Sequence, residues 1–162
     1  MTALGSRRVD RTGRSSGSRK TNRFTQLETP FAARPIRLLN SPAYRALSLS
    51  GHRALSRIEI EFAAHGGTSN GRLAVTYDDF ENYGIHRHAV APAIRELVAL
   101  GIIEVTEAGR AGNAEWRKPN FFRLTYRHID NYKPTHEWER IETDQQARDL
   151  ARAARLKRKI QR

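Results

Sequence analysis

The stretch that decides the fold runs from residue 75 to residue 126 and reads VTYDDFENYGIHRHAVAPAIRELVALGIIEVTEAGRAGNAEWRKPNFFRLTY. It begins with a short helical pattern that ends near Tyr83, and Gly84 follows, a residue that favours a turn because it adopts a positive φ at little cost. Apolar residues then recur at helical spacing and predict a second helix over Arg87–Leu100, with Pro92 near its start. The residues expected on its inward face are Val90, Ile94, Leu97 and Val98.

Two apolar runs after the second helix predict a β-hairpin. Gly101 is expected to end the helix in the left-handed conformation. Ile102–Thr106 is rich in β-branched residues and Phe121–Tyr126 is its predicted partner strand, with the Gly-rich, polar segment Ala108–Pro119 as a long loop. Helix, turn, helix and hairpin follow each other without a spare linker, and this order is what a helix-turn-helix with a β wing requires.

The residues before this stretch predict an arm and two helices. Residues 24–40 are interpreted as an extended arm packed on the domain, with a short strand at Ile36–Leu39. Ser41 precedes a proline and predicts a short helix as far as Leu47. Ser50 is the expected cap of a longer helix that ends at Gly66 and Gly67. The apolar face of that helix consists of Leu55, Ile58 and Phe62, and a short strand is expected at Leu73–Val75.

Two further helices carry capping signals. Thr76 precedes the first helix of the decisive stretch, and Asp79 three residues later predicts a capping box. Thr143 and Gln146 have the same spacing at the start of a C-terminal helix that ends in basic residues. The apolar stripe of that helix is mostly alanine, which buries little area, so pairing with a second copy is weakly supported and a homodimer stays open.

Positive charge is concentrated at the two ends of the chain, whose net charge is +12. Residues 1–23 carry seven Arg or Lys against one Asp, and residues 141–162 carry seven against three. Residues 1–23 have almost no apolar side chains, so they cannot offset the entropy cost of ordering and are predicted to be disordered. Basic flanks beside a balanced domain suit a polyanionic partner, although they would also aid solubility.

Several classes of function are disfavoured. The chain has no cysteine, which excludes disulfides and thiolate metal sites. No apolar run approaches the ~20 residues of a membrane-spanning helix. His86 and His88 lack a third ligand at metal-site spacing, and Asp78 and Asp79 are better explained as helix-capping residues than as catalytic carboxylates. No phosphate loop or nucleophile motif is present. We expect no catalytic residue, cofactor or metal, no membrane partner, and a cytoplasmic, nucleoid-associated protein.

From Ser41 to Tyr126 the chain resembles the bacterial winged helix-turn-helix proteins. The phrase RELVALGIIEV, which begins at Arg95, is similar to the join of recognition helix and wing in transcription regulators and in plasmid or phage replication initiators. The phrase AGRAGNAEWRKPNFFRLTY is similar to small helix-turn-helix proteins of bacterial genomes and mobile elements. The resemblance implies binding to double-stranded DNA, with the second helix in the major groove.

The predicted organisation therefore has four parts: a basic disordered arm over 1–23, an α+β winged helix domain with a three-helix core and a β-hairpin wing over 24–130, a linker over 131–142, and a basic C-terminal helix over 143–162. The expected DNA contacts are residues predicted to be exposed, and all but Ala91 are cationic or polar. At the start of the second helix they are His86, Arg87, His88, Ala91 and Arg95. In the wing they are Arg110, Asn113, Arg117 and Lys118. In the arm they are Arg19, Lys20 and Arg23.

A simpler interpretation treats these cations as solvated surface charges and Trp116 as an anchor of the hairpin. Against it, Arg87 lies at the leading edge of a helix that follows a glycine turn, where side chains meet base edges. The expected function is sequence-specific binding of duplex DNA by a transcription regulator. The alternatives are a replication-initiation or mobile-element protein and an architectural or RNA-binding basic module. The last is disfavoured because no exposed aromatic pair lies on a predicted sheet.

Overall fold

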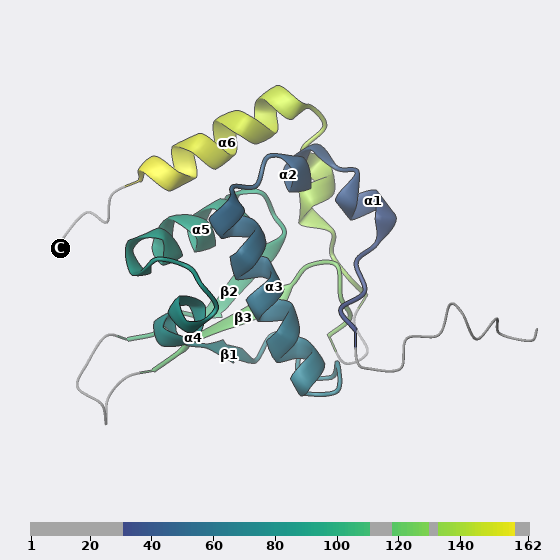
Figure 1. Ribbon diagram of the computed structural model, residues 1–162. Coiled ribbons are helices and arrows are strands. Elements are labelled where there is room, and N and C mark those ends of the chain that lie inside the picture. Colours follow the sequence, from purple (N-terminus) through teal and green to yellow (C-terminus); the bar gives the residue numbers. More distant parts are fainter. Residues whose placement is uncertain (1–30, 111–117, 130–132, 158–162) are drawn as a thin grey trace, which may run out of the picture. The chain divides into compact units, whose positions relative to one another are not determined.

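The computed structural model describes residues 31–110, 118–129 and 133–157, and the chain from Ala32 onward forms one unit of α+β architecture (Figure 1). Its elements in chain order are α1 (Ile36–Leu39), α2 (Pro42–Arg45), α3 (Leu49–Ala64), β1 (Leu73–Val75), α4 (Tyr77–Asn82), α5 (Arg87–Ala99), β2 (Ile103–Glu107), β3 (Asn120–Leu124), the 3-10 helix η3 (Glu137–Arg140) and α6 (Asp144–Leu156). Within the described residues, no helix combines the length and the apolar character needed to cross a bilayer.

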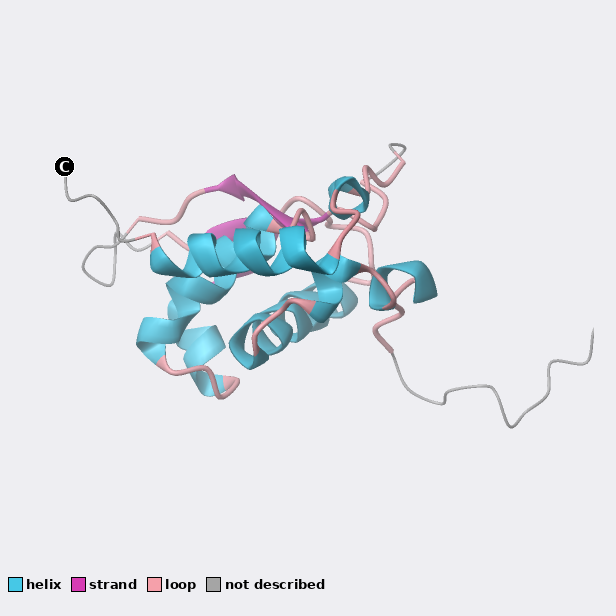
Figure 2. Cartoon of the chain, turned by 90° about the horizontal axis from the view of Figure 1, so that it is seen from above, coloured by secondary structure: helices cyan, strands magenta, loops and turns pink. Residues whose placement is uncertain are grey.

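The three strands form one antiparallel sheet in the order β1-β3-β2. Strand β3 is central: Phe122 pairs with Leu73 of β1, and Leu124 pairs with Ile103 of β2. A bulge interrupts the pairing of β2 with β3 between Val105 and Glu107. Helices α3, α4 and α5 lie together on one side of this small sheet (Figure 2). The α+β class, the hairpin and the short first strand are as the sequence predicted.

The core lies between the helices and the sheet. Fully buried apolar side chains come from α3, α4, α5 and all three strands; the largest include Leu55, Ile58, Phe80, Leu97, Phe122 and Leu124. The rings of Phe80 and Phe122 meet edge to face with centroids 6.0 Å apart. Burying one such side chain contributes about 1.5–3 kcal/mol relative to leaving it exposed. The apolar positions that define this core are those with helical or strand periodicity in the sequence.

Helix starts are fixed by side chains that accept hydrogen bonds from backbone N–H groups. Ser41 Oγ accepts from Tyr44 N at 3.1 Å, and Thr143 Oγ1 accepts from Gln146 N at 3.2 Å, as expected. The cap of α3 is Ser48, whose Oγ accepts from Gly51 N at 3.1 Å, so the expectation of Ser50 as the cap was wrong. The longer helix therefore starts at Leu49, two residues earlier than a cap at Ser50 would place it.

Two other local expectations were wrong. Residues 36–39 form the helix α1 rather than a strand, because the carbonyl of Pro35 accepts hydrogen bonds from Leu38 N and Leu39 N and so nucleates a turn. Val98 is 41% exposed rather than inward-facing. The buried face of α5 is set by the spacing of Val90, Ile94 and Leu97, and a residue one step beyond Leu97 lies about 100° around the helix.

The segment expected to be a linker contributes to the core. In its described part, Trp138 and Ile141 are buried. Gly101, at φ +67°, ends α5, and a Cβ at this position would lie 2.8 Å from backbone atoms of both Glu137 and Trp138. Helix α6 then packs on α5 (Figure 1), and its Ala147, Ala151 and Ala154 are buried. The small alanine side chains allow close approach of the two helices, so α6 belongs to the same unit.

A buried carboxylate ties the residues before α1 to α3. Glu59 is 2% exposed, and Arg34 Nε donates to its two oxygens at 2.8 and 2.9 Å. The hydroxyl of Tyr126 donates to Glu59 Oε1 at 2.5 Å. Arg34 also donates to Tyr44 and Ser56. Burial, together with the neighbouring Glu59 charge, raises the pKa of Tyr126 well above its ordinary value. The buried Glu59 carboxylate thus accepts hydrogen bonds from two other parts of the chain.

We predict that Arg34→Met lowers the free energy of unfolding by about 2–4 kcal/mol, because it leaves the Glu59 carboxylate buried without its cation. The double variant Arg34→Met/Glu59→Leu should recover part of that loss, since the charge is then also removed. Urea unfolding of both variants tests this. Arg72→Met, which changes an exposed arginine, is the control, and equal losses for Arg34→Met and Arg72→Met would contradict the prediction.

Candidate nucleic-acid interface

Contacts at the start of α4 and at the turn after it hold the α4–α5 pair in place. The capping box forms as expected: Thr76 Oγ1 accepts from Asp79 N at 3.1 Å, and Asp79 Oδ2 accepts from Thr76 N at 2.8 Å. Gly84 has φ +87°, which a residue with a side chain rarely adopts. Arg53 Nη1 on α3 donates to the Gly84 carbonyl at 2.8 Å. Ile85 is buried beside it. The position and direction of the start of α5 are thereby fixed relative to α3 and α4.

Asp79 also illustrates the electrostatics of this turn. Partial burial alone would raise the pKa of its carboxyl, but hydrogen bonds from Thr76 and the nearby Arg57 guanidinium lower the pKa below its usual range. Asp79 is therefore ionised at neutral pH, at the positive end of α4. Its charge is used within the helix cap and toward α3, since Arg57 Nη2 lies 3.6 Å from Asp79 Oδ1.

The first residues of α5 form an exposed polar surface. His86, Arg87 and His88 are all exposed, and Ala91 one turn on is half-buried. The rings of His86 and His88 lie with centroids 3.7 Å apart. His86 occupies the N-cap position but makes no side-chain capping bond, so the backbone N–H groups of the first turn of α5 are not capped by it. These three predicted site residues are brought together at the positive end of the helix.

Arg87 is not isolated on this surface. Its Nη1 lies 2.7 Å from Asp78 Oδ1 and 2.8 Å from Glu81 Oε2, so it joins the start of α5 to α4. These hydrogen bonds raise the pKa of Arg87 further. All three side chains are about half exposed, and exposed ion pairs of this kind contribute little to stability. Two carboxylates therefore stand next to the cation predicted to contact DNA, and a DNA group must compete with them.

The structure places Arg95 away from the start of α5. Its Nε donates to the Ala154 carbonyl at 2.9 Å and its Nη2 to the Arg155 carbonyl at 3.1 Å, so it satisfies the last carbonyls of α6. In return, Arg155 Nη1 pairs with Glu96, a fully buried carboxylate on α5. We call this pair of contacts the α5–α6 clamp. Sequence reasoning missed it because nothing local to Arg95 indicates which helix packs beside it.

The neck of the hairpin brings two predicted cations together. Arg110 and Lys118 face each other across the hairpin, with backbone N–H to carbonyl distances of 3.1 and 3.2 Å in the two directions. Gly109 N donates to Asn120 Oδ1 at 2.7 Å and closes the neck. Both cationic side chains are exposed. The other predicted contacts, Asn113, Arg117, Arg19, Lys20 and Arg23, lie outside the described residues, as does Trp116.

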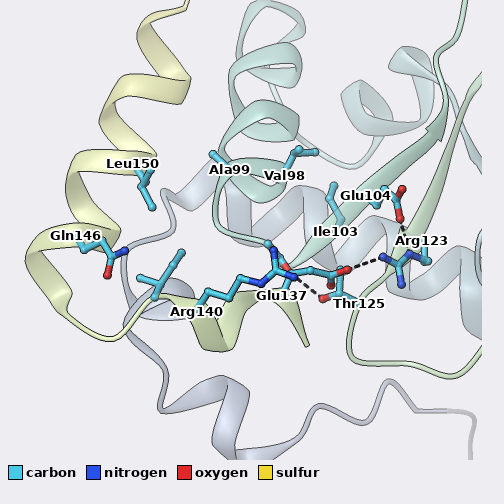
Figure 3. A pocket seen from close by; sticks show the side chains of 12 residues that line it. Val98, Ala99, Ile103, Glu104, Arg123, Thr125, Glu137, Arg140, Gln146 and Leu150 are labelled. Atoms are coloured by element: carbon cyan, nitrogen blue, oxygen red, sulfur yellow. Dashed lines mark hydrogen bonds and ion pairs between the residues drawn. The ribbon is translucent and has the colours of Figure 1, made fainter. Parts of the chain in front are cut away.

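The opposite end of α5 borders a hollow of about 420 Å³ between β2, η3 and α6 (Figure 3). Its apolar lining includes Val98 and Leu150. Three charged side chains of its lining pair with one another: Arg123 Nε lies 2.6 Å from Glu104, and its Nη2 lies 2.8 Å from Glu137. The residues that the structure describes contain no group of three or more His, Cys, Asp or Glu suited to a metal ion.

No family model, curated protein or solved structure matches this chain. The class is accordingly defined by the structure alone: an α+β protein with a three-stranded antiparallel sheet, compatible with a winged helix, in which two helices joined at Gly84 expose the start of the second.

We predict that Arg95→Ala lowers the free energy of unfolding by about 1–2 kcal/mol, because the last carbonyls of α6 lose a charged donor. Urea unfolding measures the loss, and faster hydrogen exchange confined to α6 locates it. Arg148→Ala, an exposed arginine on α6, is the matched control with a change near zero. If Arg95→Ala leaves stability intact and weakens duplex binding instead, Arg95 is a DNA contact and the clamp is unimportant.

Proposed function

We propose that this chain binds double-stranded DNA as a winged helix-turn-helix protein and acts as a transcription regulator. The observation that carries the proposal is the exposed start of α5, where His86, Arg87 and His88 follow the turn at Gly84. The chain order α3, β1, α4, α5, β2, β3, with the sheet order β1-β3-β2, supports it. In that arrangement the second helix of the pair enters the major groove by its N-terminal residues.

The side chains at the start of α5 suit base edges. The Arg87 guanidinium has the paired donors that match guanine O6 and N7. The imidazoles of His86 and His88 donate to phosphates or bases, and the uncapped N–H groups of the first turn favour an anion. Arg110 and Lys118 at the hairpin neck would contact the phosphates beside the groove. Contacts to the bases then come from the start of α5, and contacts to the DNA backbone come from the hairpin.

The carboxylates beside Arg87 favour selective binding. Asp78 and Glu81 repel phosphates of any sequence, so they weaken non-specific binding throughout. At a site where a guanine accepts both donors of Arg87, the new bidentate contact compensates for the lost ion pairs. The expected result is a larger ratio of specific to non-specific affinity at some loss of total affinity.

The proposal is tested by selecting genomic fragments with the full-length protein at about 150 mM salt, where non-specific phosphate binding is weakened. We expect a sharp enriched motif. A palindrome that overlaps promoters indicates regulation, and direct repeats at an origin indicate replication. Binding at low salt without enrichment, or stronger binding to a matched RNA, would overturn the proposal.

We predict opposite effects for the two sides of the Arg87 ion cluster. Arg87→Ala should weaken binding to the selected duplex by about 1–3 kcal/mol and relax the preference at one base position. Glu81→Gln should strengthen binding to all duplexes, because it removes a negative charge from the interface without changing side-chain size. Fluorescence anisotropy with the selected and a scrambled duplex measures both.

The matched control for Glu81→Gln is Glu139→Gln, which removes one negative charge from η3, and it should leave affinity unchanged. Equal gains in duplex affinity from the two glutamine variants would mean that the effect of Glu81→Gln comes from the change in net charge alone. If Arg87→Ala weakens all sequences to the same extent, Arg87 contacts phosphate and does not read a base.

A further inference from the structure

Helix α6 runs antiparallel to α5, with its C-terminal end toward the start of α5. Near its beginning, Gln146 and Leu150 share the hollow with Val98 and Ala99, the last residues of α5. Near its end, the carbonyls of Ala154 and Arg155 meet Arg95, four residues further back along α5. Figure 1 shows the same arrangement, with the C-terminal end of α6 directed toward the start of α5.

The α5–α6 clamp holds this end of α6 in place. The last carbonyls of a helix have no partner within the helix, so an unsupported end frays. Here Arg95 donates to two of those carbonyls, and Arg155 pairs with the buried Glu96. One arginine from each helix thus reaches the other helix. The clamp gives the final turn of α6 a defined position relative to the surface at the start of α5.

The second half of α6 is basic on its outer side. Ala151 and Ala154 are buried, whereas Arg152 and Lys157 are exposed. Residues 150–157 contain no acidic residue, and the nearest acidic residue before them is Asp149, three positions from Arg152 on the helix. The first half differs, because Asp144 pairs with Arg45 and Asp149 accepts hydrogen bonds from Gln145. Positive charge is therefore exposed at the end of α6 that lies toward the start of α5.

We infer that the C-terminal half of α6 is a second DNA-backbone contact, in which Arg152 and Lys157 bind phosphates that border the groove entered by α5. This inference rests on the proposed function. At 1.5 Å per residue, Arg95 lies about 13 Å along α5 from His86, which is close to the ~12 Å width of the major groove. A phosphate strand beside the groove is then within reach of the two side chains on α6.

The experiment measures binding of the full-length protein to a mixed-sequence duplex of about 30 base pairs, roughly three helical turns, over a range of salt concentrations. The variant Arg152→Gln/Lys157→Gln should lower affinity about three- to tenfold at about 100 mM salt, to the same extent for every sequence. The slope of log K against log salt should fall by about two, one for each phosphate contact removed.

The matched control is Arg72→Gln/Arg140→Gln, which removes two exposed arginines before β1 and in η3 and should leave the salt slope unchanged. Thermal unfolding confirms that both variants fold. If the α6 variant keeps the salt slope of the unaltered protein, or if the control lowers it equally, the inference is overturned while duplex binding stands. If the unaltered protein binds no duplex at any salt concentration, the proposed function fails and the inference fails with it.

Discussion

The arrangement of the helices depends on one buried carboxylate, that of Glu96. A charge without solvent is tolerated only when donors surround it. Glu96 accepts from Ser48 N at 3.0 Å and from Ser48 Oγ at 2.6 Å, and it pairs with Arg155. Because Ser48 caps α3, this single group fixes the start of α3, the middle of α5 and the end of α6 together. Gly51 is constrained by it too, since a Cβ there would lie 2.9 Å from Glu96 Oε2.

Glu59 has the equivalent function on another side of α3. Buried ion pairs contribute little net stability compared with apolar residues of the same size, but a misplaced partner leaves an uncompensated charge. Glu59 and Arg57 lie two residues apart, so they project from nearly opposite sides of the helix. Arg57 contacts Asp79 at the start of α4, whereas Glu59 holds Arg34. The segment that contains Arg34 therefore joins α3 on the side opposite α4.

Features that depend on neighbours in sequence could be predicted, and features that depend on distant partners could not. The cap at Thr76, the turn at Gly84 and the strand after Gly101 each follow from residues within one turn of one another. The environments of Arg95 and Trp138 depend on chain segments tens of residues away, so Arg95 was expected on the DNA surface and residues 131–142 were expected to be a linker. A local signal can also be interpreted wrongly. An extended arm was expected around Pro35, but Pro35 is the N-cap of the helix α1.

The cations at the start of α5 and those at the end of α6 differ in their neighbouring charges. At the start of α5 the cation is balanced by carboxylates, since Arg87 lies between Asp78 and Glu81. At the end of α6, residues 150–157 contain the exposed cations Arg152 and Lys157 and no acidic residue. A balanced cation gains from a duplex only where a base replaces its partners, whereas an unbalanced cation gains from any phosphate. If both surfaces meet the same duplex, α6 supplies affinity that is independent of sequence, and α5 can keep its carboxylates and still bind.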